Sequence, residues 1–490
     1  MKKHYILALL FVFSSFLNTK AQQYFSIPND LKESHRSVKD AFTITNPNTK
    51  TLSVFIDDNK TINAYIYNEN SERIDSLVSD GLPKKYSEII GYIQKEQKTI
   101  LYLKHRNGKQ FGSILFDFKN RKTKEIEFDF KLRGEQYVES LSKNNKLYLI
   151  TTPKKRSVLK LYEFEGLYPK KHLIPIDYTF RIADNEKLNL YGMLKNLKKS
   201  SPDPIELRKI DTEFPVSVEL AGAMNKLYET DKGFELTLDK SIYETYIIAV
   251  DLKDYKADIT RFEKPKYSTE ERFFSKSFLL DDNIYQIVGN ADELFFEAKN
   301  RNTANVLKKL HVNKDDVIPF KNTPIIQDKE GSIFAPHREL KKTSKFLKKI
   351  DNEDISVAVQ KKNNKYIITM GSFTKPYYGS SSTFMMAPTP GMGMGAPTMM
   401  TVPIGSNINL SLSSYLTYAY GKSVRIKCLF DSNFNHIEGE IPENAFDRIK
   451  KYAKLLHDPI AENVFEWNNS IYYGYYNKEG EAYRIMNFSK

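Results

Sequence analysis

The sequence contains few cysteines and histidines, the residues that crosslink a chain or most often bind zinc. It has one cysteine, Cys428, among 490 residues, and its eight histidines never fall at the spacing of metal ligands along one element. A lone cysteine cannot form an internal disulfide, so the fold has to be stabilised by burial. Cys428 lies in an alternating apolar run, which predicts a buried thiol.

Familiar catalytic motifs are also absent. The sequence holds no G-x-S-x-G, H-E-x-x-H, Walker or C-x-x-C motif, and no run matches a calcium-binding loop. Short acidic clusters such as Asp57-Asp58 and Asp281-Asp282 fall at expected turns, where side-chain capping explains them. The sequence therefore favours a protein without catalytic activity, although a site assembled from distant segments would leave no motif.

Long apolar runs are confined to the first 21 residues. A basic start at Lys2 and Lys3 is followed by an apolar run over Tyr5–Leu17 and by small residues up to Ala21. This pattern predicts a signal peptide, residues 1–21, cut near Ala21, and an exported protein that is periplasmic or extracellular. No later segment reaches the about 18 apolar residues of a spanning helix, so we expect no transmembrane anchor.

The chain is basic, with a formal net charge of +13 that falls to +10 without Lys2, Lys3 and Lys20. Export argues against a nucleic-acid partner. The lysines also occur as scattered pairs in expected turns, such as Lys84-Lys85 and Lys154-Lys155. We interpret them as solvated loop charge, and the alternative is attraction to anionic envelope lipid or polysaccharide.

A β-hairpin with a polar turn recurs along the chain, which is rich in strand-forming aromatics, with 31 Tyr and 31 Phe. The three clearest copies cover residues 52–67, 100–116 and 147–162. Asn-Gly and Pro-Lys turns between β-branched and aromatic runs supply the backbone angles that a chain reversal needs. Comparable hairpins start near Phe234, Ile284 and Ile471.

The spacing of these hairpins is typical of β-propeller blades. From residue 52 to residue 284 their first strands are 48, 47, 87 and 50 residues apart, and Leu188–Tyr191 is the candidate for a unit missing from the longest interval. A period of about 40–50 residues with four strands per unit predicts a propeller. We therefore expect an all-β fold in which residues 22–490 form one β-propeller of seven or eight four-stranded blades. Two separate β domains are the alternative.

The two ends of the chain are expected to pair. Residues 463–488 supply three strands of a last blade, and Tyr24–Ile27 can supply the fourth, which would remove exposed strand edges. This architecture resembles that of exported bacterial β-propeller-like proteins, a likeness of general plan that implies no particular site residues.

Two segments have helical spacing instead and predict short peripheral helices. One follows Pro442-Glu443-Asn444 and ends near His457, and the other covers Arg338–Ile350. A role of the second at a membrane surface is an alternative to simple packing.

Residues 376–406 differ sharply in composition from the rest of the chain. They contain six of the eleven Met, interleaved with Gly, Pro, Ser and Thr, and no charged residue or His. Between two expected strands, Lys365–Met370 and Leu410–Tyr418, they would form a loop far longer than hairpin loops. Three interpretations of this loop remain open from the sequence: an unstructured insertion, an adaptable apolar contact surface and a copper(I) site.

These observations lead us to expect a non-catalytic binding propeller of the bacterial cell envelope that has no cofactor and binds an envelope or extracellular protein or a glycan. The expected contacts lie in the Met-rich loop, at Tyr377, Tyr378, Phe384, Met385, Met386, Met392, Met394, Met399 and Met400. One alternative is a copper(I)-binding protein with Met392 and Met394 as ligands. The other is an enzyme that processes glycans or peptides, which converging carboxylates at the ring axis would favour.

Overall fold

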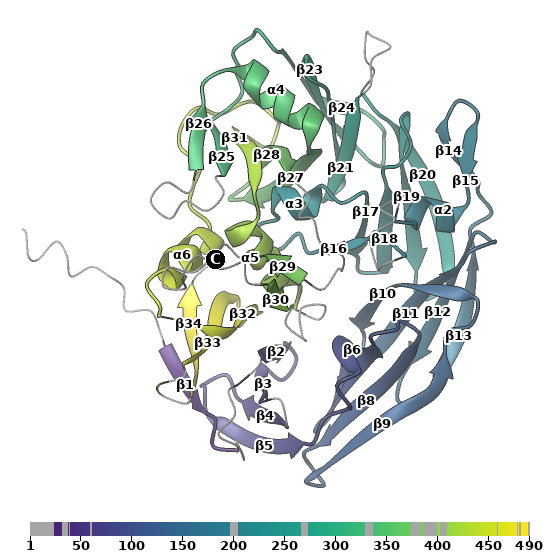
Figure 1. Ribbon diagram of the computed structural model, residues 1–490, viewed down its shortest axis with the longest axis vertical. Coiled ribbons are helices and arrows are strands. Elements are labelled where there is room, and N and C mark those ends of the chain that lie inside the picture. The colour runs from purple at the N-terminus through teal and green to yellow at the C-terminus, as the bar shows by residue number, and fades with distance from the viewer. Residues whose placement is uncertain are drawn as a thin grey trace, which may run out of the picture.

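The computed structural model consists mainly of antiparallel β-sheets arranged around a common centre (Figure 1). It describes residues 24–31, 38, 40–58, 61–196, 204–265, 273–328, 337–373, 383–385, 399–401, 409–457, 459–477, 479 and 482–488. The expected signal peptide, 1–21, lies outside these residues. No helix in the described part of the chain is long and apolar enough to cross a membrane.

Seven sheets of four or five strands form the described ring, which confirms the expected propeller, and we number them blades 1 to 7. In blades 1 to 3 the strands follow one another in chain order, and the first strand lies nearest the centre (Figure 1). Blade 1 comprises β2 (Asp40–Asn46), β3 (Thr51–Asp57), β4 (Ile62–Tyr67) and β5 (Arg73–Ser79). Blade 2 comprises β6 (Tyr86–Lys95), β7 (Lys98–His105), β8 (Gln110–Asp117) and β9 (Lys122–Lys131). Blade 3 comprises β10 (Glu135–Lys143), β11 (Lys146–Pro153), β12 (Val158–Phe164) and β13 (Pro169–Pro175).

Blades 4 and 5 follow after a small hairpin and a short helix, which are β14 (Phe180–Ala183), β15 (Glu186–Leu188) and α2 (Leu190–Leu194). The expectation of a whole blade at Leu188–Tyr191 is therefore wrong. Blade 4 has five strands, because β16 (Arg208–Ile210) adds in parallel to β17 (Asn225–Glu229), β18 (Gly233–Leu238), β19 (Glu244–Asp251) and β20 (Lys256–Glu263), with α3 (Val218–Ala221) between β16 and β17. Blade 5 comprises β21 (Phe274–Leu280), β22 (Asn283–Gly289), β23 (Glu293–Asn300) and β24 (Val306–Asn313).

Blade 6 is built out of chain order. Its outer strands come first in the sequence, and its third strand follows the Met-rich segment. From the outside inwards it comprises β26 (His337–Leu340), β25 (Ile325–Asp328), β31 (Ser423–Phe430), β28 (Lys365–Phe373) and β27 (Asp354–Lys362). Helix α4 (Thr343–Asn352) links β26 to β27, and between β28 and β31 lie the hairpin β29 (Thr383–Met385) and β30 (Met399–Thr401) and helix α5 (Leu410–Tyr420).

Blade 7 closes the ring as expected. It comprises β32 (Ile460–Trp467), β33 (Ser470–Asn477), β34 (Ala482–Phe488) and, as its outer strand, β1 (Tyr24–Pro28) from the other end of the chain. Trp467 Nε1 donates to the carbonyl of Lys50 at 3.2 Å, and Asn463 Nδ2 donates to Thr43 Oγ1 at 3.0 Å. These bonds join blade 7 to blade 1.

The helices agree with the sequence in part. The expected helix after Asn444 is α6 (Ala445–Ala453), which begins with a capping box between Asn444 and Asp447. The second expected helix, Arg338–Ile350, is α4, although the first three residues of the expected range belong to β26. The expectation of a strand at Leu410–Tyr418 is wrong, because α5 occupies it, starting at the N-cap Asn409 and packing against blade 7 and α6.

Apolar side chains fill the space between neighbouring blades. Phe55 of blade 1 packs edge-on against Phe116 of blade 2, with ring centroids 5.4 Å apart, and Tyr285 of blade 5 contacts Tyr366 of blade 6 at 6.4 Å. Cys428 is fully buried in the cluster between blades 5 and 6, which confirms the expected buried thiol. Because each interface buries its own set of side chains, the long chain needs no single large core.

Candidate functional site

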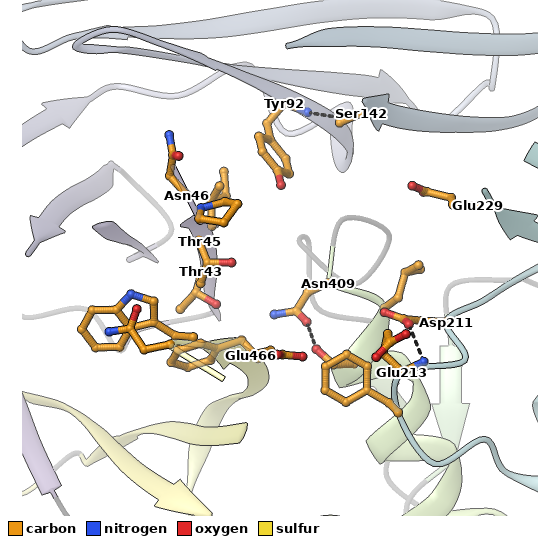
Figure 2. Close-up of a pocket in the computed structure, with 18 of the residues that line it drawn as sticks. Thr43, Thr45, Asn46, Tyr92, Ser142, Asp211, Glu213, Glu229, Asn409 and Glu466 are labelled. Carbon is orange, nitrogen blue, oxygen red and sulfur yellow. Dashed lines mark hydrogen bonds between the residues drawn. The ribbon is translucent and has the colours of Figure 1, made fainter. Parts of the chain in front are cut away.

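A cavity of about 1030 Å³ lies where the inner strands converge. Its walls come from β2, β6, β10, β16, β17 and β32 of five blades and from the start of α5 (Figure 2). A cavity of this size, lined from several blades, is the usual place for a ligand in a closed β architecture. We call it the central cavity.

The central cavity is acidic. Five carboxylates and only two ammonium groups line it: Glu69, Asp211, Glu213, Glu229 and Glu466, with Lys50 and Lys209. Figure 2 shows Asp211, Glu213 and Glu466 around the same part of the cavity, although they come from blades 4 and 7. The ring closure therefore brings together acidic groups that are more than 200 residues apart in the sequence.

The parallel pairing of β16 with β17 brings two of these carboxylates to the same end of neighbouring strands. Ile210 lies opposite Tyr228, so the next residues, Asp211 and Glu229, continue the two strands together. The residues on either side of the acidic segment 211–213 are held in place. Ile210 is buried, and Phe214 stacks on Phe446 of α6 with ring centroids 6.1 Å apart. The short acidic segment is thereby held at the cavity wall.

Each of the two lysines forms an ion pair with a carboxylate other than Asp211 and Glu213. Lys209 Nζ lies 3.3 Å from Glu229 Oε1 and donates to the carbonyl of Ser140 at 3.0 Å. Lys50 Nζ lies 2.8 Å from Glu69 Oε2. Among the described residues, no lysine or arginine forms an ion pair with Asp211 or Glu213. These two carboxylates are available to a cation that enters the cavity.

Burial first, and then the negative charges of Glu213, Glu229 and Glu466, together raise the pKa of Asp211 to about 6. The backbone N–H of Glu213, which donates to Asp211 Oδ1 at 3.0 Å, acts in the opposite direction. At neutral pH the carboxylate is ionised in surroundings that disfavour its charge. A positive charge that binds beside such a group stabilises its ionised form.

Besides apolar residues such as Ile44 and Phe465, the wall contains polar side chains that hydrogen bonds hold in place. Asn409 Oδ1 accepts from Ser411 Oγ at 2.5 Å, and its amide donates to Asn463. The N–H of Tyr92 donates to Ser142 Oγ at 2.8 Å, which joins blade 2 to blade 3 at the cavity. The wall therefore offers fixed amides and hydroxyls as well as carboxylates.

Metal binding is not suggested by the described side chains. Among them, no three His, Cys, Asp or Glu are placed so that they could hold a metal ion.

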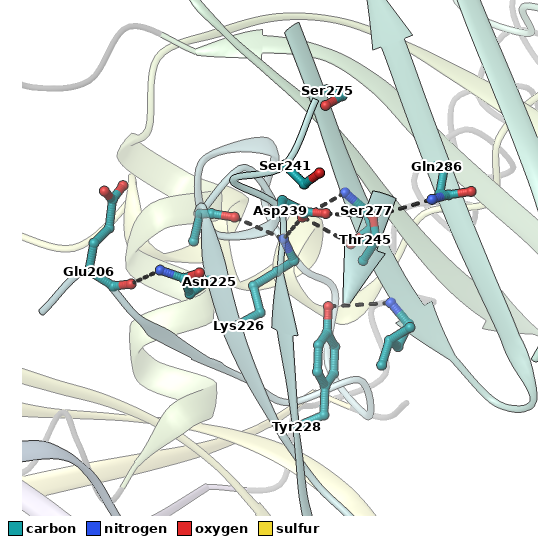
Figure 3. A network of polar contacts seen from close by, with 12 residues as sticks. Glu206, Asn225, Lys226, Tyr228, Asp239, Ser241, Thr245, Ser275, Ser277 and Gln286 are labelled. Atoms are coloured by element: carbon teal, nitrogen blue, oxygen red, sulfur yellow. Dashed lines mark hydrogen bonds and ion pairs between the residues drawn. The ribbon is translucent and has the colours of Figure 1, made fainter. Parts of the chain in front are cut away.

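A second group of charged side chains lies buried between blades 4 and 5 (Figure 3). Asp239 accepts from Lys226 Nζ at 3.0 Å, Thr245 Oγ1 at 2.8 Å and Ser277 Oγ at 2.9 Å. Lys264 Nζ donates to the carbonyl of Asp239 at 2.9 Å and to Ser275 Oγ at 2.7 Å. Partners within the protein already occupy these groups, so the cluster serves to join the two blades.

The Met-rich segment is described only in part. Tyr377, Tyr378, Met386, Met392 and Met394 lie outside the described residues. Of the other expected contact residues, Phe384 and Met385 belong to β29 and Met399 and Met400 to β30, and the two strands pair so that Met385 lies opposite Met399 and Phe384 opposite Met400. The expected contacts and copper ligands therefore stay predictions. The chain resumes at Asn409, in the wall of the central cavity.

Sequence reasoning did not identify the carboxylates of the central cavity. Asp211 and Glu213 stand in a connection between strands, Glu229 is the last residue of β17, and Glu466 is the last but one of β32. No motif marks any of these positions in the sequence. Of the residues that line the cavity, only the position of Asn468-Asn469 could have been predicted from the sequence. Two successive asparagines between strands favour a tight turn, and both have a positive φ.

No protein-family model matches the sequence, and no curated protein matches it. Several solved structures resemble the fold distantly. The dihydro-heme d1 dehydrogenase NirN in complex with DHE is 10% identical, with a TM-score of 0.27, over 60% of this chain and 50% of that one. Prolyl oligopeptidase B from Galerina marginata is 11% identical, with a TM-score of 0.30, over 68% of this chain and 39% of the other.

The structure of the Dos1 propeller is 11% identical, with a TM-score of 0.25, over 73% of this chain and 84% of that one. The chain thus spans half or less of the first two proteins. At these identities and TM-scores the likenesses carry no argument about function, and the propeller assignment rests on the sheets themselves.

Proposed function

We propose that this chain is an exported binding propeller of the bacterial cell envelope and that its ligand occupies the central cavity through a positively charged group. The single observation that carries the proposal is the excess of carboxylates in that cavity, where Asp211 and Glu213 have no cationic partner among the described residues. The signal-like first 21 residues support export.

The size and lining of the cavity narrow the class of ligand. Its volume of about 1030 Å³ lies at the upper end of small-ligand pockets, which suits a short stretch of polymer. Side-chain amides and hydroxyls suit hydroxyl or peptide groups, and the carboxylates suit an amine. An amino-sugar oligosaccharide and a lysine-rich peptide meet both requirements, in agreement with the glycan or protein partner expected from the sequence.

Binding of matched cationic and neutral probes tests this proposal. Glucosamine oligosaccharides and oligolysine would be titrated by calorimetry beside N-acetylated oligosaccharides of equal length. We expect the cationic probes to bind and the double variant Asp211→Asn/Glu213→Gln to weaken them at least about tenfold, as expected for the loss of two charge-assisted contacts.

The matched control is Asp231→Asn/Glu186→Gln, which removes the same charge at exposed positions of blade 4 and of β15. Equal affinity for cationic and neutral probes, or an equal loss in both double variants, would show that the cavity does not select a cation.

Hydrolysis of a glycan or peptide is a second candidate. It is favoured by the pKa of about 6 at Asp211, since a carboxyl group that titrates close to neutral pH can take up and release a proton as a general base or acid. Product formation from labelled oligosaccharide and peptide mixtures, abolished in Asp211→Asn, would support catalysis. Binding without turnover would support the non-catalytic function.

The Met-rich segment is a separate part of the proposal. We expect it to contact an envelope partner through its methionines and aromatic residues, since thioether side chains adapt to irregular apolar surfaces. Capture from envelope extract would be compared between the full protein and a variant lacking residues 376–406. Silver(I) titration of the same pair tests the copper(I) alternative, which requires saturable binding that is lost when Met392 and Met394 are replaced by Leu.

A further inference from the structure

The outward side of α4 carries a concentration of positive charge, at the top of the molecule in Figure 1. Its inward side is apolar and buried through Phe346, Leu347 and Ile350. Lys345 and Lys348 lie on the exposed side, and Lys341 and Lys342 extend it just before the helix. We call these four residues the lysine face.

The lysine face is not used by the fold. Among the described residues, no carboxylate forms an ion pair with any of its four lysines. By contrast, Lys349 on the same helix lies 3.2 Å from Glu353, and Lys361 in the next strand lies 2.7 Å from Asp281. Four long side chains without partners on one short surface produce a strong local positive potential.

The position of these lysines on α4 is unfavourable for the helix itself. The N-cap is Lys342, which makes no side-chain capping bond, and the first turn contains no acidic residue. The positive end of the helix dipole therefore meets further positive charge, whereas α6 begins with the favourable Asn444 and Asp447. Phosphate groups beside these lysines would relieve this repulsion.

The surroundings of the lysine face are open and contain an exposed apolar residue. Thr343 Oγ1 donates to the carbonyl of Asp316 at 2.5 Å, which holds the preceding loop against the helix, and the next residue, Val317, is 79% exposed. His337 and Arg338 of β26 add basic groups, and Glu339, Asp315 and Asp316 add acidic ones. None of the four lysines lines the central cavity.

We propose that the lysine face is a docking surface for an anionic lipid bilayer, on which the protein binds peripherally through lipid phosphates. A bilayer fits better than an anionic polysaccharide because no aromatic side chain belongs to the four described residues of the face, whereas the exposed Val317 beside it can enter the interface. The binding is electrostatic and reversible, since the apolar side of α4 is already buried.

Sedimentation with vesicles tests this proposal on the purified protein. Vesicles of phosphatidylglycerol and phosphatidylcholine would be compared with pure phosphatidylcholine, at low and high salt. We expect binding only to the anionic vesicles and its loss near 1 M salt, where the screening length is about 3 Å. Replacing all four lysines by Gln should weaken binding at least about 100-fold, since each juxtamembrane lysine contributes about fivefold.

A charge-matched control replaces Lys154, Lys155, Lys170 and Lys171, which are exposed on blade 3, by Gln. Its binding should fall by no more than about threefold, through net charge alone. Because all eight lysines are exposed, both variants should keep the melting temperature of the parent, and this is checked first.

Three results would overturn the proposal: no binding of the parent protein to anionic vesicles, equal weakening in both variants, or capture by soluble dextran sulfate without binding to vesicles. The last result would assign the lysine face to an anionic polysaccharide instead.

Discussion

Lys226 Nζ lies 3.0 Å from Asp239 Oδ2, and both side chains are fully buried between blades 4 and 5. Burial acts to raise the pKa of Asp239, but the ammonium groups of Lys226 and Lys264 lower it to about 2. This is below the about 3.9 of an unfolded aspartate, so the stabilising contribution is present above pH about 4 and is lost as the pH falls towards 2.

Asp239→Asn should destabilise the protein strongly, by about 3–5 kcal/mol, because it leaves Lys226 buried without its counter-charge. Urea denaturation at neutral pH measures the loss. Asp184→Asn is the control, since its ion pair with Arg181 at 2.9 Å and its hydrogen bond from Tyr243 are exposed, and their loss should cost much less. Equal free energies of unfolding for the two variants would contradict the structural role of the buried pair.

The closure of the ring by β1 gives a second prediction. Ile27 is fully buried on the inner side of β1, while the neighbouring Ser26 is exposed. Ile27→Ala should cost about 2–5 kcal/mol, lower the melting temperature and promote aggregation, because loosening β1 exposes the edge of β34. Thermal melts and size-exclusion chromatography measure these effects, and a Ser26→Ala variant that aggregates to the same degree would argue against them.

The ring and its closure could be predicted because their signals are local. Apolar runs on either side of a polar turn identified the hairpins of β3 with β4, β7 with β8 and β11 with β12. The runs are nearly continuous because both faces of such strands pack against neighbouring blades. In β3, Val54 packs in the cluster with blade 7 and Phe55 in the cluster with blade 2. Helix α5 could not be predicted this way, because its Leu-Ser-Leu-Ser start alternates like a strand, and only the Asn409 cap and burial on nearly all sides make it helical.

The acidic cavity could not be predicted either, for a different reason. Its carboxylates come from residues 69, 211, 213, 229 and 466, and only the closed ring places Glu466 near Asp211. No local sequence pattern can indicate a contact between residues of two blades that lie far apart in the sequence, such as blades 4 and 7. The tight asparagine turns, by contrast, repeat at matching positions and give a further prediction.

Asn145 and Asn364 each end a two-residue turn between the first two strands of a blade, with φ of 56° and 59°. Replacing either by Ala should cost about 1 kcal/mol, because the left-handed region is unfavourable for a side chain without a local hydrogen bond. Replacement by Gly should be nearly neutral. Chemical denaturation of the Ala and Gly variants at each site makes the comparison, and an Ala variant as stable as Gly would contradict the role of these angles.

Asp211→Asn should increase the stability of the protein near pH 8 while it weakens binding in the central cavity. The pKa of Asp211 in the folded protein, about 6, is above that of an unfolded aspartate, so folding favours the protonated form. Its favourable contribution is therefore full below pH about 4 and is lost as the pH rises through 6. The amide avoids the cost of ionisation, and the expected gain is about 1–3 kcal/mol at pH 8 and close to zero at pH 4. Denaturation at both pH values measures it, with the exposed Asp231→Asn as the control, which should show no such pH dependence.

A variant that is more stable but binds cationic probes less well is the expected behaviour of a residue kept for function, since strained charges persist where a ligand uses them. Loss of stability at pH 8 would instead mean that Asp211 holds the wall of the cavity together.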